Sequence, residues 1–154
     1  MEVLEKAFAV ALTIPDNEAF TALETLRRLG FVLGGVRRAD IWSFEVDAPA
    51  AAALADTIAT IETLFNPNKH EIAERPGARP QAGEVWIAPF DDPGVGSIGR
   101  GSIPGVHAVR RRVAWQLLDE SGSIVAPNVL ERAVETFLCN PAFQKAIGCG
   151  SMNW

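Results

Sequence analysis

The chain has 154 residues and a mass of 16.6 kDa, which suits one ordinary domain or two very small ones. Hydrophobic residues make up 48% of it and charged residues 21%, a composition that excludes a disordered protein. The net charge of −5 argues against a nucleic-acid binder, and two cysteines are too few for a disulfide framework. No stretch approaches the roughly 20 apolar residues of a membrane span, and the N-terminus lacks the pattern of a secretory signal. We therefore expect a cytoplasmic protein that binds neither membrane nor nucleic acid.

The first predicted elements are a strand over residues 6–14 and a helix over 17–30. Asp16 or Asn17 is expected to cap this helix, and Gly30 fits the position that follows its last turn. Glu24 and Arg28 are spaced to form an ion pair on its outer face. Its apolar residues share the opposite face: Ala19, Ala22, Leu23, Leu26 and Leu29.

A second strand is predicted over residues 31–47. Within it the wholly apolar face of Trp42, Phe44 and Val46 alternates with a largely polar one, as in a half-buried antiparallel sheet. Asp47 is expected to cap a second helix, with Pro49 in its first turn. Residues 69–74 are expected to form a short edge strand. The expected core stripe of the second helix is Ala51, Leu54, Ala55, Ile58, Ile61 and Phe65.

The pattern then begins again. VRRADIW at 36–42 recurs as VRRRVAW at 109–115, an offset of 73 residues. ETLFNP at 62–67 recurs as ETFLCNP at 135–141, with Glu-Thr offset by 73 and Asn-Pro by 74. TIP at 13–15 meets IAP at 87–89, again at an offset of 74. We infer two copies of one unit, at 1–74 and 84–154, joined by a linker at 75–83.

The second copy lacks the first helix, because residues 91–105 hold five glycines and two prolines. It resumes with a strand at 109–119, a turn at 120–123 and a helix at 127–138. The expected buried stripe of that helix is Leu130, Ala133, Val134 and Phe137.

Two groups of residues are candidates for binding. Gly94, Gly96 and Gly99 match G-x-G-x-x-G, and their backbone with Arg100 is suited to a phosphate, although GSIPG prevents the helix that such a motif opens. A surface loop that binds a partner is the favoured interpretation. The second group holds arginines at equivalent places in the two copies, which either face one anion or pair with nearby carboxylates: Arg37, Arg38, Arg110 and Arg111, with Arg112 beside them.

Other polar and aromatic residues suggest packing more than chemistry. His70 and His107 have no further ligand at metal-binding spacing, so no metal is expected. Cys139 is expected to be a small buried residue. Trp42 and Trp115 are equivalent in the two copies, which favours a role in packing over a ligand pocket.

The order strand, helix, long strand, helix, short strand predicts an α+β fold of two tandem ferredoxin-like units, with helices on one face of antiparallel sheets. The first half resembles the small PurS subunit of phosphoribosylformylglycinamidine synthase. The resemblance rests on Leu29-Gly30, on the strand Val36–Asp40 and on Leu64-Phe65-Asn66-Pro67. The chain is about twice the length of a typical subunit of that family, and the glycine-rich 91–105 segment departs from the family pattern.

The resemblance implies a non-catalytic subunit, without cofactor, that bridges the glutaminase and the synthetase of purine biosynthesis. A homo-oligomer is expected through exposed sheet edges. The alternative is a regulatory module of ferredoxin-like units that binds a small molecule or phosphate. A third hypothesis is a small enzyme that uses the glycine-rich loop for a phosphorylated substrate.

Overall fold

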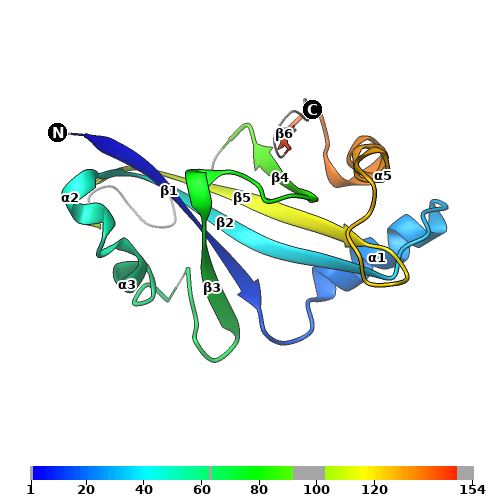
Figure 1. The fold of residues 1–154 in the computed structure, drawn as a ribbon, viewed down its shortest axis with the longest axis horizontal. Coiled ribbons are helices and arrows are strands. Elements are labelled where there is room, and N and C mark those ends of the chain that lie inside the picture. Colours follow the sequence, from blue (N-terminus) through cyan, green and yellow to red (C-terminus); the bar gives the residue numbers. More distant parts are fainter. Residues whose placement is uncertain (1, 63, 92–102, 149–154) are drawn as a thin grey trace. The chain divides into compact units, whose positions relative to one another are not determined.

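The computed structural model describes residues 2–62, 64–91 and 103–148 (Figure 1). It confirms an α+β fold with an open antiparallel sheet, consistent with a ferredoxin-like type. The six strands lie in the order β3-β1-β2-β5-β4-β6. The strands are β1 Val3–Leu12, β2 Gly35–Asp47, β3 His70–Arg75, β4 Glu84–Pro89, β5 Val106–Leu118 and β6 Gln144–Ile147. The helices are α1 Asn17–Arg28, α2 Ala48–Ala51, α3 Leu54–Ile58 and α5 Pro127–Ala133, with a 3₁₀ turn η1 Pro76–Ala78 and a π-helical turn η2 Val134–Leu138.

The chain forms two compact units, each built from three segments. Unit 1 comprises Met1–Ile14, Asp40–Arg79 and Asp92–Arg112, and unit 2 comprises Pro15–Ala39, Pro80–Asp91 and Val113–Trp154. The long strands β2 and β5 therefore each contribute one end to unit 1 and the other to unit 2. These units are defined by contacts, whereas the predicted division into 1–74 and 84–154 is defined by repeated sequence. That sequence repeat stays a prediction.

In unit 1, β1 pairs with β2 on one side and with β3 on the other, both antiparallel, and β3 is an edge strand as expected. Trp42, Phe44 and Val46 are buried in one cluster with Leu54 and Ile58 of α3. The prediction of a half-buried strand is wrong at Ile41 and Ser43, which are also buried. The Ser43 hydroxyl accepts a hydrogen bond of 2.8 Å from Arg112, so this polar group has a hydrogen-bond partner although it is buried.

The second predicted helix is broken into α2 and α3. Its exposed alanines Ala52 and Ala53 make no core contacts that would hold one long helix together. The hydroxyls of Thr57 and Thr60 bond to backbone oxygens of the preceding turn. Asp47 stands at the start of α2 without capping it, because its carboxylate accepts a 2.7 Å bond from His107 instead. Of the expected stripe, Ala55 is exposed, whereas Leu64, which was not expected to belong to it, is buried.

Helix α1 in unit 2 begins and ends as its sequence predicts. Asp16 accepts bonds from the backbone N–H groups of Glu18 and Ala19. At the other end Gly30 has a φ of 99° and donates to Arg27, while Phe31 donates to Leu26, which is a Schellman motif. Two details differ. Leu29 leaves the helical conformation and is 51% exposed, and Glu24 pairs with Arg27 at 3.6 Å instead of Arg28.

The remainder of unit 2 packs α1, α5 and η2 around strands β4, β5 and β6. Strand β4 pairs with β5 and with β6, both antiparallel. Gly34 closes this core at the entry to β2, where a Cβ atom would overlap the Asp119 carbonyl oxygen. The cluster contains Leu26, Phe31, Leu33, Val85, Ile87, Leu117, Val125, Leu130, Ala133, Val134 and Leu138.

Candidate functional site

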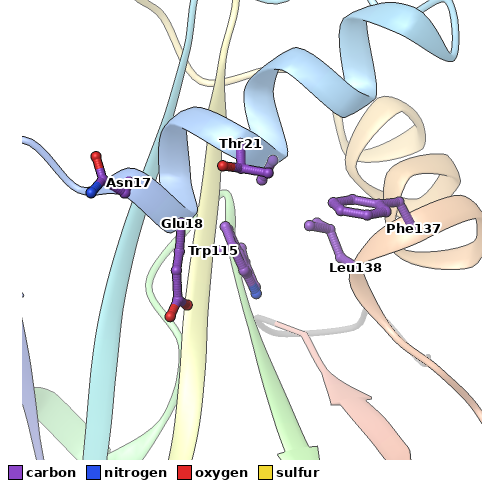
Figure 2. Close-up of a pocket in the computed structure, with 7 residues that line it drawn as sticks. Asn17, Glu18, Thr21, Trp115, Phe137 and Leu138 are labelled. Atoms are coloured by element: carbon purple, nitrogen blue, oxygen red, sulfur yellow. The ribbon is translucent and has the colours of Figure 1, made fainter.

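A pocket of about 380 Å³ opens in unit 2 between α1 and η2 (Figure 2). Strand β5 contributes Trp115 to it. The pocket thus has a polar wall from one helix, an aromatic ring from the sheet and an apolar wall from the other helical segment. The full lining is Asn17, Glu18, Thr21, Ala22, Trp115, Phe137 and Leu138.

The polar wall follows from the start of α1. Asn17 and Thr21 lie one turn apart, as do Glu18 and Ala22, so the four residues share one face of the helix. Ala22 is 2% exposed and makes close contact with the core, whereas the Glu18 side chain is 70% exposed. The Asp16 cap fixes the first turn from which Asn17 and Glu18 project.

Trp115 lies against a cation that is only partly exposed. The Arg38 guanidinium carbon is 5.8 Å from the centre of the indole, within the range of a cation–π contact. Arg38 donates to the Glu18 carboxylate at 2.9 Å and lies 3.9 Å from Asp16, with only 12% of its side chain exposed. These contacts hold Trp115, Arg38 and Glu18 as one group, because each restricts the next.

The apolar wall comes from the π-helical turn. The N–H of Cys139 donates to the carbonyl of Val134, five residues earlier, at 3.2 Å. This wider turn changes which side chains face the core. Phe137, expected to be buried, is 40% exposed and lines the pocket, and Leu138 is 7% exposed and belongs to both pocket and core. The predicted stripe is wrong at Phe137 because it assumed a regular α-helix.

The structure separates the predicted arginines into individual pairs. Arg37 is exposed, and its Nη1 lies 3.5 Å from the Gln116 Oε1. Arg110 pairs with Glu45 at 3.2 Å. Arg111 pairs with Asp40 at 2.8 Å, and its guanidinium carbon is 5.9 Å from the centre of Trp42. Arg38, Arg110 and Arg111 each pair with a carboxylate. This is one of the two alternatives that the sequence left open, the other being a shared anion.

The glycine-rich candidate cannot be placed. Gly94, Gly96, Gly99 and Arg100 lie outside the described residues, so their proposed contact with phosphate or a partner stays a prediction.

The two histidines each make a hydrogen bond within the protein. His107 binds Asp47, and the His70 Nδ1 accepts a bond from the backbone of Asn66.

Cys139 is half-buried and lines a second cavity in unit 2, of about 440 Å³. Burial raises the pKa of its thiol, which keeps the group neutral. The other lining residues are Glu131, Val134, Glu135, Pro141, Gln144, Lys145 and Ala146.

Sequence reasoning missed Glu18, Thr21 and Phe137 as pocket residues. The repeat marked Trp115, but as a packing residue equivalent to Trp42. The sequence did contain one signal for the wider turn that carries Phe137: the second copy has one residue more than the first between its Glu-Thr and its Asn-Pro.

Comparisons with known proteins give no family for this chain. No family model matches it, and no curated protein matches it significantly. Across residues 2–62, 64–91 and 103–148, no helix is long and apolar enough to cross a membrane.

Proposed function

We propose that the chain is a binding module that takes a small organic molecule in the Trp115 pocket of unit 2. The observation that carries the proposal is the pocket itself, which an indole ring, an apolar wall and the polar side chains of Glu18, Asn17 and Thr21 line. Its volume of about 380 Å³ falls in the range of small-ligand sites, which are largely apolar with a few placed polar groups.

A comparison of the two equivalent tryptophans supports this function. Trp42 and Trp115 stand at an offset of 73 residues in similar sequences. Trp42 is 5% exposed and packs in the core of unit 1, whereas Trp115 is only partly buried and borders the pocket. Packing alone accounts for Trp42. Trp115 also packs against the core of unit 2, but it keeps exposed surface, and it borders the pocket.

Filling the pocket tests the function. Thr21→Trp places a large ring in the pocket, and Thr60→Trp adds the same ring at an exposed position in unit 1 as the matched control. A thermal-shift screen of small organic molecules on the wild type is expected to yield compounds that stabilise it by about 2.7 kcal/mol at a hundredfold excess over Kd. That response is expected to survive in the control and to vanish with Thr21→Trp. Hits that stabilise both variants equally bind elsewhere and contradict the proposal.

A second candidate is a PurS-like subunit made of two fused ferredoxin-like units. It is favoured by the strand pairing, since β1 pairs with β2 and β3 while β4 pairs with β5 and β6. It is also favoured by two equivalent contacts, Arg38 with Trp115 and Arg111 with Trp42, at 5.8 and 5.9 Å. In this role the chain is non-catalytic, self-associates and joins the glutaminase and synthetase of purine biosynthesis.

Light scattering of the purified chain, alone and mixed with the synthetase and glutaminase of its host, tests this second function. A larger complex that depends on glutamine supports it. Arg37→Glu with Arg110→Glu reverses two exposed charges and is expected to weaken that complex, while Arg28→Glu, also exposed, is the charge-matched control. If the chain forms no complex with either partner, the PurS-like role is excluded and the pocket proposal is unaffected.

A further inference from the structure

We infer that the Trp115 pocket takes an aromatic amine, a compact aromatic body that carries one protonated nitrogen. The inference rests on the proposed binding function and names the ligand class. Three properties of the site lead to it: the charge of the polar wall, the use of the donors at the start of α1, and the shape of the apolar wall.

The polar wall carries excess negative charge. Among the residues that the structure describes, Asp16 and Glu18 both pair with Arg38, so two carboxylates share one cation there. The Glu18 Oε2 binds Arg38, and no bond to its Oε1 occurs within the described part of the chain. Because the side chain is 70% exposed and borders the pocket, this oxygen is available to accept from a ligand. An ammonium group satisfies both the free acceptor and the charge.

Groups that would favour an anion are already in use. The backbone N–H groups of Glu18 and Ala19, which a helix start otherwise offers to an anion, donate to Asp16 Oδ1 at 2.9 and 3.1 Å. Arg38 is 12% exposed and held by two carboxylates. An anionic ligand would have to displace Glu18 and then lie beside it, at a cost in like-charge repulsion.

The rest of the pocket requires an apolar body. Trp115 presents a ring, and Leu138 and the 40% exposed Phe137 form the wall across the pocket from α1 (Figure 2). Aromatic ligands gain from offset or edge contacts with such rings beyond the area they bury. A volume of about 380 Å³ suits a ligand of one or two rings.

Titration calorimetry with three matched probes tests the inference: 2-phenylethylamine, 2-phenylethanol and 3-phenylpropionate. These share a phenyl ring on a short chain and differ in the charge of the polar end. We expect the amine to bind the wild type at least about tenfold more tightly than the alcohol, and the acid to bind most weakly. Glu18→Gln is expected to remove most of the difference between amine and alcohol. Glu24→Gln, on the same helix outside the pocket, is the matched control and is expected to keep it.

The outcomes separate the ligand class from the site. If amine and alcohol bind equally, and Thr21→Trp abolishes both, the pocket is a binding site but the amine inference is wrong. Tightest binding by the acid overturns the inference in the same way. If Thr21→Trp leaves amine binding intact, the amine binds outside the pocket. That result contradicts both the proposed binding function and the amine inference. If none of the probes binds, the amine inference fails, while the wider screen still decides the binding function.

Discussion

Asp119 organises the loop after β5 with one carboxylate oxygen. Its Oδ1 accepts from the Ser121 hydroxyl at 2.6 Å, from the Ser121 N–H at 2.9 Å and from the Ser123 N–H at 3.0 Å. These bonds favour the ionised form, so the Ser121 hydroxyl first and the Ser123 backbone next lower the pKa of Asp119 below its usual range. The ESGS sequence predicted a turn here, and the aspartate before it supplies the bonds that form it.

The lowered pKa of Asp119 has a defined effect on stability. Its folded-state pKa lies below the unfolded value, so its contribution is complete above the unfolded pKa and disappears as pH falls through the folded one. Asp119→Ala should therefore lower the free energy of unfolding at pH 7, by a difference that shrinks as the solution is acidified through that range. Urea denaturation at several pH values measures it, with the exposed neighbour Glu120→Ala as control. A difference independent of pH would show that the carboxylate bonds do not stabilise the loop.

At the scale of elements, η2 links the repeat to the pocket. The offset between the two similar segments rises from 73 residues at Glu-Thr to 74 at Asn-Pro, and the π-helical turn lies at this position in the second segment. A π-helical turn accommodates one additional residue in a helix and is frequent at functional sites. Here it brings Phe137 to the pocket while Leu138 keeps a place in the core.

Deleting Thr136 tests the role of this turn. A regular α-helix advances about 100° per residue, so removal of one residue rotates Phe137 and Leu138 relative to α5. We expect ΔThr136 to keep a near-wild-type far-UV circular dichroism spectrum and to lose the thermal-shift response to ligands of the Trp115 pocket. Thr136→Ala keeps the residue count and should retain the response. A deletion variant that still responds would mean that the π-helical turn does not shape the pocket.

The elements that the sequence predicted best are those specified by local signals. Helix α1 carries its own cap at Asp16 and its own end at Gly30, so both ends are confirmed. Signals failed where tertiary packing decides. The alanines around Ala52 favour one continuous helix, but Ala52 and Ala53 are exposed, and the helix breaks there although Ala51 and Leu54 on either side pack against the core. The polar face of β2 at Ser43 is buried because Arg112 reaches it. The pocket joins residues of α1, β5 and η2, and no local pattern indicates that these meet.

On the scale of the whole molecule, each long strand serves two cores. Residues 40–47 of β2 and 106–112 of β5 belong to unit 1, and the remainder of both strands belongs to unit 2. Loss of one core therefore releases one end of two strands that the other core also needs. This arrangement predicts that the chain unfolds in a single cooperative transition, although it contains two units.

One truncation in each core measures this cooperativity. Leu54→Ala in unit 1 and Leu130→Ala in unit 2 remove side chains that are 2% and 1% exposed, and each should cost about 2–5 kcal/mol. Urea denaturation followed by tryptophan fluorescence and by circular dichroism should give coincident transitions in both variants. Val32→Ala, at a residue 71% exposed, is the control and should change little. Separate transitions for the two probes would show that the units unfold independently.

The composition of the units also sets the order in which the chain can fold during its synthesis. Unit 1 needs the segment that ends at Arg112, and unit 2 needs residues beyond Val113. Neither core is complete while β5 is still inside the ribosome, although β1, α1 and β2 have long since emerged. For several seconds, at about 5–20 residues per second, the nascent chain presents the apolar side chains of β2 with no finished core to bury them. Translation speed and chaperone access should therefore govern the yield of this protein more strongly than that of a chain whose N-terminal half closes on itself.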